Sequence, residues 1–154
     1  MKEKKQEKLK KQISQPTAHA ASAEKRERYF EATGGRKTAI ARARIYAKGF
    51  GLTVNDKDFK NYFKTSKNQI AAVAPFETLK LGDRFKATVR VSGGGINAQA
   101  EAVRNALAKA LVKFNKEFKK RLRKSGFITR DARMVERKKY GLKKARRAPQ
   151  WQKR

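Results

Sequence analysis

The chain has 154 residues, of which 42 are Lys or Arg and 13 are Asp or Glu, so its formal net charge is +29. A compact monomer with this charge would repel itself, and the composition therefore predicts a polyanionic partner, for which nucleic acid is the natural choice. The lack of cysteine excludes disulfides, zinc knuckles and thiolate catalysis, and the lack of any apolar run near the about 20 residues that span a bilayer predicts a cytoplasmic protein without a membrane partner.

The positive charge is concentrated toward the C-terminus. Residues 1–28 carry a net charge of +5, residues 29–112 of +9 and residues 113–154 of +15. We interpret residues 1–27 as a disordered charged leader, because Lys and Glu alternate there before a Ser/Pro/Ala stretch without an apolar stripe. Binding to a polyanion should be strongest in the last quarter of the chain.

A β-hairpin is predicted where the leader ends. Residues 29–33 and 38–47 have the composition of strands, and the segment 34–37 between them, Gly-Gly-Arg-Lys, has that of a turn. Side chains alternate between the faces of a strand, so Arg42 and Arg44 should project together and meet phosphate, while the opposite face packs on a core. The packing face should consist of Ala39, Ala41, Ala43 and Ile45.

The sequence between residues 52 and 75 predicts one short strand and two short helices. Residues 52–54 indicate a third strand that ends at an Asn-Asp turn. Residues 58–63 and 67–73 have helix-like spacing, and Pro75 is expected to end the second helix.

The segment from 85 to 114 contains the clearest pattern. Residues 85–92 alternate strictly between apolar and polar, which predicts a strand that presents Arg90 away from the core. Three glycines, 93–95, follow, and then small and apolar residues recur every four positions, which predicts a helix that faces the core. The repeating positions are Ala98, Ala102, Ala106, Ala110 and Phe114.

Beyond about residue 119 the apolar residues lose any period, and Lys or Arg occupies 16 of the last 36 positions. We interpret this segment as an extended tail. It mixes basic residues with aromatic, Gly and Pro residues, especially over 140–154, which a solubilising tail would not need. Basic residues neutralise phosphates, and arginine planes and aromatic rings stack on exposed bases.

Two glycine motifs have alternative interpretations. Gly93, Gly95 and Ala98 fit the dinucleotide spacing G-x-G-x-x-G/A, but that fold also needs a second βαβ step and an acidic residue about 20 positions on. Close packing of strand and helix explains the glycines better. The segment 34–38 fails the phosphate-loop pattern because Arg36 separates the last glycine from Lys37. A turn that presents both cations to RNA phosphates is the simpler interpretation.

We find no set of residues suited to catalysis. A nucleophile beside a general base, or a carboxylate pair in an apolar cleft, cannot be assembled from this sequence. We therefore expect no enzyme activity, no metal, no cofactor and no small-molecule substrate. A nucleotide-dependent enzyme that uses the glycine run is one alternative, which a nucleotide-binding test would decide. A DNA-compacting protein is the other, which preference for duplex DNA over structured RNA would reveal.

Three stretches of the chain match motifs of one protein family. The first is Gly93–Gln99 with the spaced small residues that follow it, the second is 126–131 with 135–141 and the final Lys-Arg, and the third is the hairpin 32–39 with its two arginines. Together they resemble the ninth protein of the small ribosomal subunit in its bacterial form, over about residues 28–154. Two features differ from the family: the leader lies outside its pattern, and Trp151-Gln152 stands where Phe-Ser is common.

The resemblance implies an α+β domain, with a mainly antiparallel sheet of about four strands and helices packed on it. It divides the chain into the leader at 1–27, an RNA-docking domain at 28–118 and a long extended basic tail at 119–154. It implies a structural protein of the small-subunit head that binds ribosomal RNA and touches neighbouring head proteins. It also implies that the tail threads through ribosomal RNA and approaches the anticodon stem-loop of peptidyl-site tRNA.

The predicted RNA-binding residues are basic, with one tyrosine added. In the domain they are Arg36, Lys37, Arg42, Arg44 and Arg90. In the tail they are Arg121, Arg123, Lys124, Arg130, Arg133, Arg137, Lys138, Lys139, Tyr140, Lys143, Lys144, Arg146 and Arg147. The resemblance assigns Lys153 and Arg154 to the tRNA. Contacts of this kind should weaken strongly as the salt concentration rises.

Overall fold

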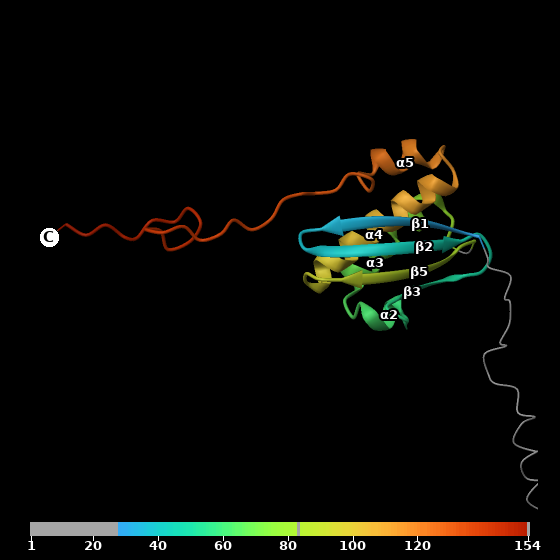
Figure 1. The fold of residues 1–154 in the computed structure, drawn as a ribbon, viewed down its shortest axis with the longest axis horizontal. Coiled ribbons are helices and arrows are strands. Elements are labelled where there is room, and N and C mark those ends of the chain that lie inside the picture. The colour runs from blue at the N-terminus through green and yellow to red at the C-terminus, as the bar shows by residue number, and fades with distance from the viewer. Residues whose placement is uncertain (1–27, 83, 154) are drawn as a thin grey trace, which may run out of the picture.

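The computed structural model describes residues 28–82 and 84–153. The predicted leader, residue 83 and Arg154 lie outside the described residues. The strands are β1 (Tyr29–Arg36), β2 (Ala39–Tyr46), β3 (Gly51–Val54), β4 (Lys57–Asp58) and β5 (Lys86–Ser92). The helices are α2 (Phe59–Tyr62), α3 (Ser66–Leu79), α4 (Ile96–Phe114) and α5 (Phe118–Lys124). Figure 1 shows these elements gathered into one α+β domain.

The sheet is mixed, with five strands among the described residues in the order β1-β2-β5-β3-β4. The β1–β2, β2–β5 and β3–β4 pairs are antiparallel, whereas β3 and β5 are parallel. The prediction of a mainly antiparallel sheet of about four strands is therefore corrected. The parallel pair arises because β4, α2 and α3 form a crossover between β3 and β5. β4 was missed because it has two residues, although the Asn55-Asp56 turn before it has φ of 47° and 63°, as a tight hairpin turn requires.

The β1–β2 hairpin turns later than predicted. β1 continues through both glycines to Arg36, and the turn consists of Lys37 and Thr38. The glycines therefore serve the strand and not the turn. A Cβ on Gly34 would lie 2.6 Å from the carbonyl oxygen of Ala102 and would also clash with the backbone of Ala106. Only glycine allows β1 to approach α4 this closely.

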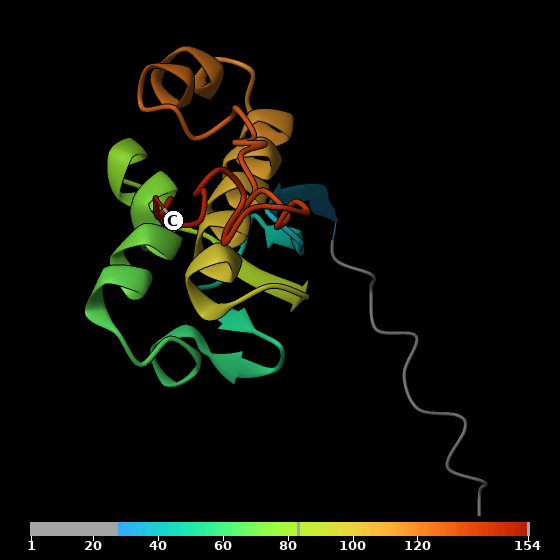
Figure 2. The same cartoon turned by 90° about the vertical axis from the view of Figure 1, so that its left-hand side faces the viewer.

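The core lies between one face of the sheet and α4. The predicted packing face of β2 is confirmed, since Ala39, Ala41, Ala43 and Ile45 are fully buried. Phe85 and the predicted apolar face of β5 are also buried, together with the small residues of α4. Figure 2 shows α4 against the sheet and α3 on the far side of α4. No helix in the part of the chain that the structure describes is long and apolar enough to cross a membrane.

One helix extends beyond its predicted end, and another was not predicted. α3 passes through Pro75 and ends at Leu79, so the prediction that Pro75 ends it is wrong. One further turn buries Phe76 and Leu79, and burial of this kind supplies most helix stability in proteins. A further helix, α5, begins at Phe118, so the first residues of the segment predicted as an extended tail are helical, and Leu122 is completely buried. Phe127 and Ile128 also pack on the core.

We predict that Gly34→Ala lowers the free energy of unfolding by about 1–3 kcal/mol or more, because the new methyl group would force α4 away from β1. Urea denaturation of the full chain measures this change. Gly82→Ala is the control, since a Cβ there would meet no atom within 4 Å. Equal stability of the Gly34 variant and the unmodified chain would show that the close approach is not required.

Candidate nucleic-acid interface

Three arginines project from the face of the sheet that the helices leave uncovered. Arg42 on β2 lies directly opposite Arg90 on β5, and Arg44 lies opposite Thr88. The predicted orientation of Arg42 and Arg44 is confirmed, since the residues that alternate with them are buried on the other face. Together with Thr53, these side chains line a shallow hollow of about 180 Å³. In Figure 1 this face is turned toward the viewer.

One carboxylate orients two of these arginines. Glu31 on β1 accepts a hydrogen bond from Nε of Arg44 at 2.8 Å, and its other oxygen lies 3.3 Å from Nε of Arg42. The hydrogen bond from Arg44 is the main cause that holds the pKa of Glu31 below its ordinary value, and the charge of Arg42 lowers this pKa further. The side chains of Arg42 and Arg44 are still 59% and 42% exposed, so their guanidinium groups can also meet phosphate.

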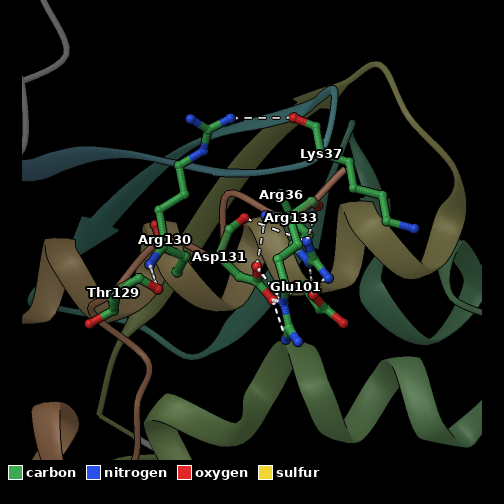
Figure 3. Close-up of polar contacts among 8 residues, drawn as sticks. Arg36, Lys37, Glu101, Thr129, Arg130, Asp131 and Arg133 are labelled. Carbon is green, nitrogen blue, oxygen red and sulfur yellow. Dashed lines mark hydrogen bonds and ion pairs between the residues drawn. The ribbon is translucent and has the colours of Figure 1, made fainter. Parts of the chain in front are cut away.

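Arg36 joins the sheet, α4 and the tail root, which we define as residues 126–133. Its Nε lies 2.6 Å from Glu101 on α4, and its Nη2 lies 3.2 Å from Asp131 (Figure 3). Its Nη1 donates to the carbonyl oxygen of Arg133 at 2.8 Å. The predicted location at the tip of a turn is wrong, because Arg36 is the last residue of β1 and its side chain is only 16% exposed. Its contact with RNA stays a prediction.

Asp131 is bound by Arg133 as well as by Arg36. The guanidinium of Arg133 donates to Asp131 at 2.8 Å and its backbone N–H donates at 2.9 Å. These hydrogen bonds hold the pKa of Asp131 well below its ordinary value. Because the folded-state pKa is lowered, the contribution of this carboxylate to stability is complete above its unfolded-state pKa and is lost as the pH falls through the folded-state pKa. At neutral pH Asp131 is therefore ionised, as its ion pair with Arg36 requires.

Arg130 connects the tail root with the uncovered face of the sheet. Its Nη2 donates to the carbonyl oxygen of Lys37 at 3.3 Å, in the turn between β1 and β2. A Cβ on Gly35 would meet Nε of Arg130 at 3.3 Å, so this side chain lies across the end of β1. Figure 3 shows Arg130 reaching toward Lys37 while Asp131 points toward Arg36.

Asn105 on α4 is a structural residue that the sequence analysis missed. It is buried, and its Nδ2 donates to the carbonyl oxygens of Phe127 at 2.8 Å and Ile128 at 3.0 Å. The guanidinium of the neighbouring Arg104 lies 5.2 Å from the centre of the Phe127 ring. A signal was present in the sequence, because a polar residue beside the apolar stripe of a helix requires a hydrogen-bond partner.

The other predicted residues lie outside the tail root and away from the three arginines of the uncovered sheet face. Arg121, Arg123 and Lys124 are exposed on α5. Residues 127–153 form neither helix nor strand, and Tyr140 is 99% exposed. Arg146 is paired with Glu136 at 2.6 Å. The exposed residues in this segment also include Arg137, Lys138, Lys139, Lys143, Lys144, Arg147 and Lys153.

Comparison with known proteins shows the family. Residues 34–154 match the model of the ribosomal protein S9/S16 family. The chain belongs to this family. It is 47% identical over 128 residues to the small ribosomal subunit protein uS9 of Desulfovibrio desulfuricans, covering 83% of this chain and 98% of that protein. It is 48% identical over 123 residues to uS9 of Cytophaga hutchinsonii, covering 80% of this chain and 96% of that protein. The predicted resemblance is confirmed.

The glycine run at 93–95 has a structural explanation. Gly93 and Gly94 have φ of 73° and 61°, a region that side chains disfavour. A Cβ on Gly93 would lie 2.6 Å from the carbonyl oxygen of Thr38, so the run also passes close to the hairpin turn. The described residues after α4 contain no further strand, and the second βαβ step of a dinucleotide fold is thus missing from them.

We predict that Asn105→Ala lowers the free energy of unfolding by about 1–3 kcal/mol, because the carbonyl groups that it binds lose a buried donor. Native-state trypsin cleavage after Arg130 should become faster. Asn68→Ala is the matched control: Asn68 is also buried, and it donates to Asn97, away from the tail root. Equal cleavage rates in the two variants would contradict the role assigned to Asn105.

Proposed function

We propose that this chain is a non-catalytic structural constituent of the small ribosomal subunit, whose domain binds ribosomal RNA in the subunit head. The observation that carries the proposal is the family match over residues 34–154, which includes the whole basic tail. The net charge of +29 supports it, since the protein needs a polyanionic partner. Neighbouring head proteins are the other expected partners, in the cytoplasm.

The domain binds RNA mainly through phosphates. Arg42, Arg44 and Arg90 lie together on a face that no described helix covers, and Glu31 restricts the rotamers of two of them. A guanidinium that is already oriented loses less entropy when it binds phosphate. Lys37 and Arg130 extend the basic strip to the turn end of the hairpin. The contacts are independent of base sequence, which suits a protein that positions folded RNA.

The tail binds RNA as an extended segment. In Figure 1 the chain runs away from the domain beyond the tail root. Segments rich in Lys and Arg have no core of their own, and RNA supplies both counter-charge and surfaces on which Tyr140 and Trp151 stack. The contacts of Arg36 and Asn105 with the tail root favour one direction of exit from the domain. The tail therefore leaves the domain in a preferred direction before it binds RNA.

The end of the tail reaches peptidyl-site tRNA. Lys153 is exposed and is followed by Arg154, which lies outside the described residues. Two terminal cations can bind the phosphates of any tRNA without reading its sequence. This property is required of a contact that every peptidyl-site tRNA makes in turn.

The tRNA contact is tested by crosslinking and mass spectrometry on translating ribosomes. We expect the peptide that contains Lys153 to crosslink to peptidyl-site tRNA, and we expect deletion of residues 153–154 to remove this adduct. Replacing Lys143 and Lys144 by alanine is the control, because it removes two cations further from the terminus and should leave the adduct in place. Adducts to ribosomal RNA alone would contradict the tRNA contact, and absence from the small subunit would overturn the whole proposal.

The phosphate contacts of the sheet are tested by the salt dependence of binding. For Arg90→Gln we expect weaker binding to small-subunit ribosomal RNA and a decrease of about 1 in the slope of log affinity against log salt concentration. Lys67→Gln removes the same charge from an exposed position of α3, on the helix side of the domain, and should leave the slope unchanged. Identical slopes for the two variants would show that Arg90 makes no specific phosphate contact.

A further inference from the structure

Two tyrosines lie side by side at the end of the uncovered sheet face that is farthest from the Lys37 turn. Tyr29 is the first residue of β1 and is the direct cross-strand partner of Tyr46, the last residue of β2. Their ring centres are 6.0 Å apart and the rings are tilted by 52°. Tyr29 is 47% exposed. The alternation of β1 sets Tyr29 and Glu31 on this face and turns the next ring, Phe30, to Phe114 on the core side.

The guanidinium of Arg44 lies over the Tyr29 ring, 5.0 Å from its centre. The same group donates to Glu31 at 2.8 Å, so it is held from two sides. Lys86 on β5 is the next cross-strand partner of Tyr46. We call Tyr29, Arg44 and Tyr46 the tyrosine platform. It combines two aromatic rings and one flat guanidinium with a lysine beside them.

This composition differs from that of the rest of the uncovered face. Arg42 and Arg90 can bind phosphates, but neither lies over an aromatic ring among the described residues. An ordinary cross-strand aromatic pair would stabilise the hairpin, and it would not need an arginine fixed over one ring. Aromatic rings and guanidinium planes are the groups on which unpaired RNA bases stack. Phosphate contacts alone therefore do not account for this end of the sheet.

Cations lie beside the platform on two sides. Arg42 is two residues from Arg44 on the same face of β2, about 7 Å along the strand. Lys86 lies on the other side of Tyr46. A base on the platform would therefore have a cation on either side for its flanking phosphates.

We propose that the tyrosine platform stacks an unpaired base of ribosomal RNA. The inference rests on the proposed function, because it takes RNA as the ligand, and it adds a site that contacts a base as well as phosphates. Arg44 holds the Tyr29 ring and offers its own plane, Tyr46 borders the base, and Arg42 and Lys86 neutralise the phosphates beside it. The site selects an unpaired nucleotide with little preference among the four bases.

The experiment measures binding of the full chain to small-subunit ribosomal RNA over a series of salt concentrations. Tyr29→Leu should weaken binding roughly tenfold, because the stack of base, Arg44 guanidinium and Tyr29 ring loses its aromatic member, and loss of one aromatic partner has about this effect. The salt slope should not change, since no charge is removed. Tyr29→Phe should bind like the unmodified chain, because it keeps the ring. Ile40→Ala is the control, as Ile40 is 61% exposed on the same face at the turn end.

Ultraviolet crosslinking of assembled small subunits provides a second readout. We expect a peptide that contains Tyr29 or Tyr46 to be joined to a nucleobase. Unchanged affinity of a folded Tyr29→Leu variant overturns the inference, as does a platform that crosslinks only to a protein. If Tyr29→Leu fails to fold, the crosslink decides. If the unmodified chain does not bind the RNA, the proposed function fails as well. If the unmodified chain binds and the tyrosine variants bind equally well, only the base-stacking inference fails.

Discussion

The fold depends on the close approach of α4 to the β1–β2 hairpin. Gly34 faces the backbone of Ala102 and Ala106, and a single Cβ at this position would separate the layers. The buried side chains on both sides are mostly alanine, so the attraction comes from many short contacts between backbones and methyl groups. α4 covers one face of the hairpin, and the other face is left uncovered, as antiparallel sheets allow. The positions of Arg42, Arg44 and Arg90 on the uncovered face therefore depend on how the opposite face packs against α4.

Three acidic residues in the described part of this basic chain orient arginines of the sheet. Glu31 holds two arginines of the sheet, while Glu101 and Asp131 hold Arg36. A protein with so much positive charge would otherwise spread its side chains into solvent. Each carboxylate fixes a guanidinium that is still partly exposed or joins two segments of the chain. The charged residues thus orient one another in addition to attracting RNA.

The sequence predicted a structural feature correctly where neighbouring residues alone determine it, and incorrectly where distant segments determine it. Alternation placed Arg42 and Arg44 correctly, because the side-chain period of a strand is two. Gly34 misled the turn assignment, since its role is to contact a helix about 70 positions away in the sequence. Pro75 misled the end of α3 because core packing outweighed a local preference. Asn105 was missed because its partners are carbonyl groups of a distant segment. Contacts between distant segments decided each of these three features.

The two ends of the hairpin place different chemistry on one surface. Its turn end meets the tail root through Arg130, and its open end carries the tyrosine platform. Eight-residue strands separate these ends by about 25 Å, and Arg42 and Arg90 lie between them. Along this face lie, in order, the proposed stacking site, the arginines proposed to bind phosphate and the start of the tail. Because the tail root is bound to the same hairpin, RNA bound to the sheet also sets the position from which the tail departs. In the proposed function, docking of the domain and the direction of the tail are therefore coupled through one hydrogen-bonded pair of strands.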